Sequence, residues 1–339
     1  MPDSQRLADY VFERLALEGV RAVFLVPGGG SMYLVDALGQ NPDIEFVPTH
    51  HEQAASIAAE AYARVTGGLG CALVSTGPGG TNAMTAVAGS WIESVPLLII
   101  SGQVKRADLL RDSGVRQMGV QEIDIVSVVR PITKYAVTIM EPTDIRYEFE
   151  KAVYLATSGR KGPVWLDIPL DVQAAQIDPK SLRRFERPPK PDLSSLNADA
   201  TAVIDLVNQA ERPIVLAGHG VRLAGASAEF QQFYEALGIP VLTTWNAMDL
   251  IPSAHPLSIG KPGVVALRGP NFAVQNSDLI LVIGARLDNL VTAFNPAKFG
   301  RCAKKIIVDV DPAELRKFPP EMNIARKVAA DARDFLSAM

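Results

Sequence analysis

The feature that most constrains the fold is a repeated alternation of short apolar runs with longer runs of helical periodicity. Apolar runs at residues 22–26, 70–75 and 96–101 each lead into a turn rich in glycine or polar residues. The first two of these turns pass into runs with helical spacing of apolar residues. Because strands that alternate with helices form parallel sheets covered on both faces, the sequence predicts an α/β fold with doubly wound, mostly parallel sheets.

A proline-rich stretch divides the chain into two such patterns. Residues 179–197 carry Pro179, Pro188, Pro189 and Pro191 with no apolar period, which is typical of a linker. The second pattern has predicted strands at residues 213–217, 240–243, 278–283 and 305–310. We therefore predict two domains in the 339 residues, spanning 1–178 and 198–339.

Composition excludes several classes of partner. The 33 basic and 37 acidic residues give a net charge of −4 without a basic stripe, which argues against nucleic acid. The apolar runs, such as residues 95–100, are too short to span a bilayer. The N-terminus is polar and lacks a signal-peptide core. Two cysteines do not make a disulfide framework, and Cys71 begins an apolar run typical of a core. We expect a cytoplasmic protein with no membrane partner.

The candidate catalytic residue is Glu52, where a predicted strand at 44–47 passes into a predicted helix at 53–65. A carboxylate at a helix N-terminus gains from the helix dipole. Helices favour acidic first turns in any case, so position alone leaves a structural and a functional role open. His51-Glu52 begins like a zinc-protease motif, but Ala55 stands where the second histidine would be. No other ligands cluster, so no metal site is predicted.

Glycine-rich and polar turns follow several predicted strands. Pro27-Gly28-Gly29-Gly30, Glu52, residues 76–82 and Gln103 all come directly after strand-like runs. In parallel sheets, ligands bind at the carboxyl ends of strands, and glycine lets a backbone approach a ligand closely. We therefore expect these residues to meet at one edge of the first sheet.

Dinucleotide fingerprints are incomplete in both halves. The third glycine of such a fingerprint is replaced by Tyr33 in the first half and by Leu223 in the second. Gly218-His219-Gly220 is predicted to be a loop, and a structural turn is favoured over a nucleotide site.

Ten short motifs follow one another in the order found in one enzyme family. They are Pro27-Gly28-Gly29, His51-Glu52-Gln53-Ala54-Ala55, Thr76-Gly77-Pro78-Gly79 with Thr81-Asn82, Ser101-Gly102-Gln103-Val104, Gln121-Glu122, Pro131-Ile132-Thr133-Lys134, Gly162-Pro163-Val164, Pro169-Leu170-Asp171-Val172, Asn271-Phe272-Ala273-Val274-Gln275-Asn276-Ser277-Asp278 and Gly284-Ala285-Arg286. On these motifs the chain resembles thiamine-diphosphate-dependent enzymes of the acetolactate (acetohydroxyacid) synthase type, and the resemblance covers nearly the whole chain.

The resemblance implies a domain organisation. The first domain would bind the pyrimidine ring of the cofactor, and the second would be the Rossmann-like central domain. The family's third, diphosphate-binding domain has a Gly-Asp-Gly signature followed by paired asparagines, which this chain lacks. We therefore expect a truncated enzyme, or one subunit of a split enzyme, that is inactive without a diphosphate-binding domain or subunit. That missing part would hold Mg²⁺.

The resemblance also implies roles for residues. Glu52 would be catalytic: it would hydrogen-bond the pyrimidine ring nitrogen and so promote loss of the thiazolium proton. Gln103, Gln121 and Lys134 would face a 2-keto acid substrate. The cofactor-binding residues would be Pro27, Gly28, Gly29, Thr76, Gly77, Pro78, Gly79 and Asn82. Should FAD bind, Gly218, Gly220 and Arg286 would contact it. A homodimer or tetramer is expected.

Two departures leave the substrate and the flavin open. Val120 stands where synthases of this type carry an aromatic residue before Gln-Glu, and Trp245-Asn246-Ala247-Met248 and Gly260-Lys261-Pro262-Gly263 differ from the expected flavin-contacting segments. The alternatives are a non-catalytic flavin- or nucleotide-binding module, or a regulatory remnant that assembles with a full-length homologue. The retained Glu52 favours the enzyme, because a remnant would not need it.

Overall fold

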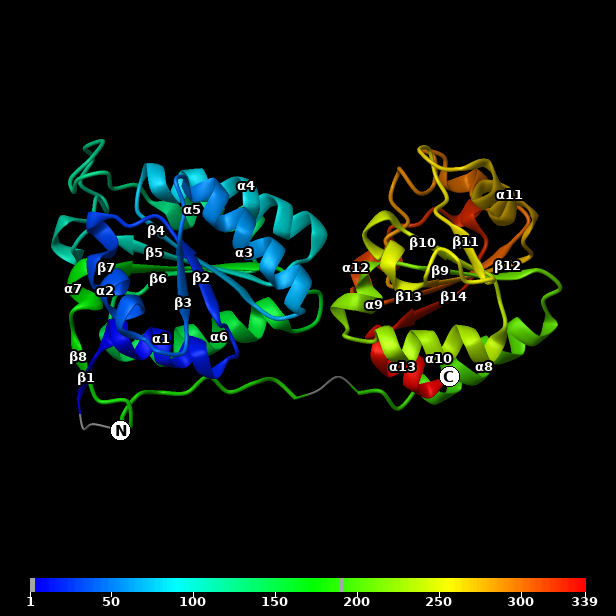
Figure 1. Cartoon of the computed structure of the whole chain (residues 1–339), viewed down its shortest axis with the longest axis horizontal. Coiled ribbons are helices and arrows are strands. Elements are labelled where there is room, and N and C mark those ends of the chain that lie inside the picture. The colour runs from blue at the N-terminus through cyan, green and yellow to red at the C-terminus, as the bar shows by residue number, and fades with distance from the viewer. Residues whose placement is uncertain (1–3, 190–191) are drawn as a thin grey trace. The chain divides into compact units, whose positions relative to one another are not determined.

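The computed structural model describes residues 4–189 and 192–339. The chain divides into two compact units, Met1–Pro189 and Lys190–Met339, each built on a six-stranded sheet (Figure 1). The division falls inside the predicted linker, whose residues 190 and 191, including Pro191, lie outside the described residues, as do residues 1–3. The predicted boundaries at 178 and 198 stay predictions.

The first unit contains a sheet in which every neighbouring pair of strands is parallel. The strand order is β3-β2-β4-β5-β7-β6, which confirms the predicted doubly wound α/β architecture. The strands are β2 (Ala22–Leu25), β3 (Glu45–Pro48), β4 (Gly70–Ser75), β5 (Leu97–Gln103), β6 (Tyr135–Thr138) and β7 (Pro163–Pro169).

Helices cover both faces of this sheet (Figure 1). One face carries α1 (Leu7–Leu17), α2 (Met32–Gln40), α6 (Ile145–Thr157) and α7 (Leu170–Gln173), and the other carries α3 (Glu52–Thr66), α4 (Pro78–Glu93) and α5 (Ile125–Val129). The strands are apolar on both sides because each face is buried: on β5, Leu98 packs into the first layer and Ile99 into the second.

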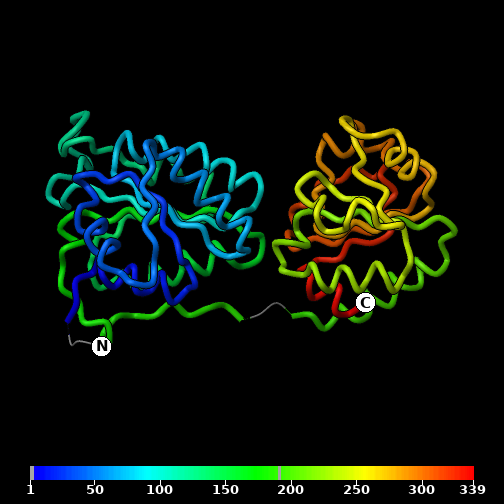
Figure 2. The backbone as a smooth tube through the Cα atoms, in the orientation of Figure 1, coloured from blue at the N-terminus to red at the C-terminus, as the bar shows by residue number. Residues whose placement is uncertain are grey.

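A short antiparallel pair brings the two ends of the first unit together. Strand β1 (Gln5–Arg6) pairs with β8 (Gln176–Ile177), so the start of the chain lies beside the segment that leaves the unit (Figure 2).

The second unit repeats the architecture with the order β11-β10-β9-β12-β13-β14, again all parallel. One face carries α8 (Leu196–Gln209), α9 (His219–Leu223), α10 (Ser227–Leu237) and α13 (Ala332–Ala338), and the other carries α11 (Arg268–Asn276) and α12 (Pro312–Arg316). The strands are β9 (Pro213–Ala217), β10 (Val241–Thr243), β11 (Ser258–Gly260), β12 (Leu279–Ile283), β13 (Lys304–Asp309) and β14 (Ile324–Ala329).

The prediction of a loop at Gly218-His219-Gly220 is wrong beyond its first residue. Gly218 is extended, but His219 begins the short helix α9, whose Val221 is fully buried. Glycine is unfavourable inside a helix, but here the burial of Val221 outweighs that cost. Strands β6, β11 and β14 were not predicted either. β14, at the sheet edge, alternates half-buried or buried residues with exposed ones and lacks an apolar run.

No helix within residues 4–189 and 192–339 is both long enough and apolar enough to cross a bilayer.

Candidate functional site

Glu52 lies at the carboxyl edge of the first sheet, as the first residue of α3. His51 caps this helix, since its Nδ1 accepts a hydrogen bond from the Gln53 backbone N–H at 3.1 Å. The neighbouring helix α4 places Asn82 opposite Glu52, and Asn82 Nδ2 donates to Glu52 Oε2 at 2.9 Å. The carboxyl group is therefore held in one orientation by an amide 30 residues away in sequence.

The second carboxyl oxygen of Glu52 faces a glycine. Among the described residues, Glu52 Oε1 has no hydrogen-bond partner, and a Cβ on Gly79 would lie 3.3 Å from it. Because Gly79 has no side chain, this half-buried oxygen stays open. It can accept a hydrogen bond from a ligand or, when protonated, donate one.

The turn before α4 requires glycine at position 77. Gly77 has φ +67°, a left-handed conformation that side chains rarely adopt, and a Cβ there would lie 1.9 Å from the Gln121 carbonyl oxygen. Pro78 follows at the first helical position, where proline is favoured. The close approach brings Gln121 to this turn, and its side chain is exposed.

The turn after β2 lies across the ends of β4 and β5. A Cβ on Gly28 would lie 2.6 Å from Ser75 Cβ, and one on Gly30 would lie 2.8 Å from the Gly102 carbonyl oxygen. Gly29 faces open space, and Pro27 is exposed. The structure thus places Pro27, Gly28 and Gly29 at the edge that carries Glu52.

Thr76 carries a buried hydroxyl at this edge. Its side chain is 3% exposed, and its backbone N–H donates to the Gly102 carbonyl at 2.8 Å. Within the described residues, Thr76 Oγ1 has no hydrogen-bond partner. A buried hydroxyl without a partner costs free energy, so Thr76 Oγ1 and Glu52 Oε1 are two polar atoms whose hydrogen-bonding capacity is unused among the described residues.

Gln103 is buried and bonded within the protein. Its Nε2 donates to the Ile123 carbonyl and to Asp167 Oδ2, each at 3.2 Å, and its Oε1 accepts from the Val104 N–H at 2.9 Å. The amide therefore does not project from the edge. Its predicted role toward a substrate stays a prediction.

Lys134 lies at the opposite edge of the sheet from Glu52, because it directly precedes β6 and all strands run parallel. Its Nζ donates to the Ser158 and Arg160 carbonyls at 2.9 and 2.7 Å, and burial lowers its pKa to about 8. The structure does not bring Lys134 together with Glu52, and its predicted substrate role stays a prediction.

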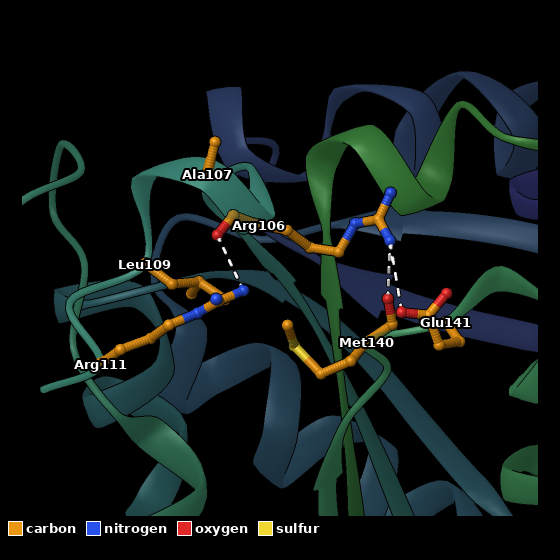
Figure 3. A pocket seen from close by; sticks show the side chains of 6 residues that line it. All are labelled: Arg106, Ala107, Leu109, Arg111, Met140 and Glu141. Carbon is orange, nitrogen blue, oxygen red and sulfur yellow. Dashed lines mark hydrogen bonds and ion pairs between the residues drawn. The ribbon is translucent and has the colours of Figure 1, made fainter.

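A pocket of about 250 Å³ occupies the other end of the carboxyl edge (Figure 3). Arg106 is held by Asp171 Oδ2 at 2.8 Å and by the Met140 carbonyl at 3.0 Å, and Arg111 Nη2 donates to the Arg106 carbonyl at 3.3 Å. The sequence interpretation did not single this pocket out. It is lined by Arg106, Ala107, Leu109, Arg111, Met140 and Glu141.

Asp167 is a buried carboxylate that the sequence interpretation missed. It is 1% exposed in β7, and burial raises its pKa to about 6, although hydrogen bonds from Ser101, Gln103 and Thr138 oppose the shift. The available signal was one carboxylate inside the otherwise apolar run of β7, since buried charges are rare unless hydrogen-bonded or paired.

In the second unit, the glycines of the incomplete fingerprint pack against another turn. A Cβ on Gly218 would lie 2.1 Å from the Gly284 carbonyl oxygen, and one on Gly220 would lie 2.7 Å from Gly284 Cα. Arg286 follows two residues later and is half-buried. The structure brings the predicted flavin residues to one edge, and backbone packing alone accounts for the glycines.

Metal ligands do not gather anywhere in the described part of the chain: residues 4–189 and 192–339 contain no group of three His, Cys, Asp or Glu side chains able to hold an ion.

Two family models match the chain. Residues 5–128 match the N-terminal TPP binding domain of thiamine pyrophosphate enzymes, and residues 200–339 match the central domain of the same enzymes.

Similar curated proteins are acetolactate synthases. A probable acetolactate synthase large subunit of Methanocaldococcus jannaschii is 35% identical over 98% of this chain and 56% of the relative. The large subunit of Corynebacterium glutamicum is 36% identical over 94% and 49%, and a probable chloroplastic acetolactate synthase of Oryza sativa is 39% identical over 91% and 46%. The chain thus spans about half the length of the relatives it matches. It belongs to the thiamine pyrophosphate enzyme family, with the N-terminal TPP-binding and central domains of an acetolactate synthase-like member.

Proposed function

We propose that this chain forms the pyrimidine-binding and central part of a thiamine-diphosphate-dependent carboligase or decarboxylase that acts on a 2-keto acid. The observation that carries the proposal is Glu52, whose Oε2 is fixed by Asn82 at 2.9 Å while Oε1 stays open. The residues at this edge suit the cofactor, because they include an open carboxyl oxygen, a Thr76 hydroxyl with no partner in the described residues, and glycines without side chains.

Each residue at the edge has a role in this proposal. When bound, thiamine diphosphate supplies carbanion chemistry at its thiazolium carbon. Glu52 Oε1 holds or accepts a proton at the pyrimidine ring nitrogen, which is general acid–base work by a positioned carboxyl group. Asn82 keeps that carboxyl in place. Gly28, Gly77 and Gly79 let the backbone approach the ring, together with Pro27, Gly29 and Pro78.

A substrate role of Gln121 is supported by its position at this edge. Its exposed side chain sits beside Gly77, next to Val120, which is 82% exposed. We propose that these two residues line the entry for the keto acid. Gln103 would act by holding the segment that carries them.

Further parts of the proposal concern cofactors and location. Mg²⁺ and the diphosphate would be held outside this chain's described residues, by a further domain or a partner chain, and FAD would lie near Gly218, Gly220 and Arg286 of the second unit. The protein would act in the cytoplasm.

The isolated chain would bind thiamine diphosphate weakly and lack carboligase activity, because the groups that hold Mg²⁺ and the diphosphate would lie elsewhere. Calorimetry with Mg²⁺ that gave a sub-micromolar dissociation constant would contradict this.

We also propose that the chain forms a homodimer or a tetramer. The face of α3 and α4 exposes several large apolar side chains, among them Ile57 at 44%, Val65 at 89%, Trp91 at 42% and Ile92 at 55%. Exposed apolar surface of this kind often marks an interface. Light scattering that showed a monomer alone at high concentration would argue against it.

The test of the catalytic assignment is Glu52→Gln, assayed with a diphosphate-binding partner present. Glutamine keeps the size of the side chain but cannot exchange a proton with the ring nitrogen. We expect hydrogen–deuterium exchange at the thiazolium carbon and keto acid turnover to fall about 10²–10⁴-fold, while the fold survives.

The matched control is Glu60→Gln on the same helix. Glu60 pairs with Arg64 at 2.6 Å, one turn away, and its substitution should change stability by about 0.5 kcal/mol and leave turnover unchanged. Parental exchange in Glu52→Gln would refute the catalytic role and favour a non-catalytic module or a regulatory remnant.

A further inference from the structure

A buried polar network lies between the first sheet and the layer of α3, α4 and α5. Asp167 Oδ1 accepts from Ser101 Oγ at 2.5 Å, and Oδ2 accepts from Gln103 Nε2 at 3.2 Å and Thr138 Oγ1 at 3.0 Å. Three donors converge on one side chain. An ionised carboxylate satisfies all of them, because it only accepts hydrogen bonds.

The directions of these bonds are fixed by groups further out. Trp165 Nε1, which can only donate, bonds Ser101 Oγ at 2.8 Å, so the Ser101 hydroxyl points its proton at Asp167. The Val104 N–H donates to Gln103 Oε1 at 2.9 Å, so the amide nitrogen of Gln103 must face Asp167. Val104 and Asp167 therefore together set which way the Gln103 amide points, the first at Oε1 and the second at Nε2.

Gln103 uses its second amide proton outside the network. Nε2 also donates to the Ile123 carbonyl at 3.2 Å, which ties the segment of residues 119–123 to the end of β5. Glu122 closes this segment, because its carboxylate accepts from the backbone N–H groups of Leu110 and Gly119. The same segment presses the Gln121 carbonyl against the turn at Gly77.

We propose that Asp167 is a positioning residue that acts through Gln103: it orients the Gln103 amide so that this amide tethers Ile123 and holds residues 119–123 against the turn before α4. Without its negative charge, the group at position 167 could no longer accept from all three donors, which would weaken the bond from the Gln103 N–H and loosen the tether. This role depends on hydrogen bonds within the chain and does not require a bound cofactor, so it is independent of the proposed function.

The test measures amide hydrogen exchange at Leu110, Gly119 and Glu122 in the full chain, expressed as protection factors. In Asp167→Asn the carboxamide can no longer accept from all three donors. We expect protection at these amides to fall at least about fivefold. In the parent, protection should fall as the pH drops from 7 to 5, since burial holds the pKa of Asp167 at about 6, whereas Asp167→Asn should lose this pH dependence. The negative charge of Asp124 also raises the pKa of Asp167.

Two further variants keep the test decisive. Gln103→Ala removes the tether but leaves Asp167, and should loosen the same three amides even if Asp167→Asn does not fold. Asp171→Asn changes a nearby carboxylate that pairs with Arg106 at 2.8 Å, and should leave the three amides within twofold of the parent. Unchanged protection in Gln103→Ala, or a parent whose protection does not vary between pH 5 and 7, would overturn the proposal.

Discussion

The two units build the same turn and place different chemistry beside it. After β2, Gly28 and Gly30 cross the ends of β4 and β5, and after β9, Gly218 and Gly220 cross the end of β12 at Gly284. In the first unit the crossing lies at the edge that carries Glu52, Asn82 and Thr76. In the second unit, Gly218 and Gly220 pack against another glycine turn, the one at Gly284.

This comparison shows that a glycine spacing reports backbone packing before it reports a ligand. The distances that exclude a side chain at Gly218 and Gly220 are measured to protein atoms, so the glycines are required whether or not a nucleotide binds. In the first unit a ligand is indicated by features of another kind. These are an open carboxyl oxygen and a buried hydroxyl with no partner in the described residues.

The largest effect should come from adding a methyl group at these turns. Gly77→Ala places a side chain on a residue with φ +67° and brings its Cβ to 1.9 Å from a backbone oxygen, and we expect a loss of about 3–5 kcal/mol in the free energy of unfolding. Gly218→Ala introduces only the clash, at 2.1 Å, and should cost about 1–3 kcal/mol. Urea unfolding followed by tryptophan fluorescence measures both.

Matched controls exist in each unit. Gly29 and Gly269 have nothing within 4 Å of an added Cβ, so Gly29→Ala and Gly269→Ala should keep parental stability or gain up to about 1 kcal/mol. If Gly77→Ala were as stable as Gly29→Ala, the segment that carries Gln121 could move away from the turn at little cost. Backbone packing would then not require glycine at position 77.

A smaller effect should separate two asparagines at these edges. Asn271 bridges Gly263 in the second unit, with Oδ1 accepting from its N–H and Nδ2 donating to its carbonyl, each at 2.9 Å. Within the described residues, the Asn82 side chain makes one bond, to Glu52. We expect Asn271→Ala to cost about 2 kcal/mol and Asn82→Ala about 1 kcal/mol in unfolding experiments. Equal costs would mean that Asn82 is also mainly structural.

The sequence was sufficient for the architecture because alternation of apolar and helical runs is a local signal. It was also sufficient to place Glu52 at a strand-to-helix turn, and strand β4 begins and ends at the predicted residues. It was insufficient where contacts are distant. The edge strand β14 lacks an apolar run, and the bonds that turn Gln103 inward come from Asp167, 64 residues away.

Lys134 illustrates the same limit and has a counterpart in the second unit. A family motif could not reveal that it directly precedes β6 at the amino edge and donates to two turn carbonyls. Lys305, the second residue of β13, lies at the amino edge in a similar way: it is 1% exposed, and its Nζ donates to the Gly300 and Ala303 carbonyls at 2.7 and 3.1 Å. Burial lowers the pKa of each lysine to about 8.

These two lysines carry the last expected effect, which is absent at neutral pH and appears only in alkali. Each folded-state pKa of about 8 lies below the ordinary value of 10.5, so between these two pH values the unfolded chain binds more protons than the folded one. The free energy of unfolding should therefore gain a rising contribution from pH 8 to 10.5, as the cost of burying the charge is relieved. Lys305→Met should remove this contribution from the second unit and Lys134→Met from the first. Urea unfolding at a series of pH values checks it. If the free energies of unfolding of the parent and of a methionine variant changed in parallel over that range, the lysine would be solvated, and its bonds to the backbone carbonyls would contribute no pH dependence.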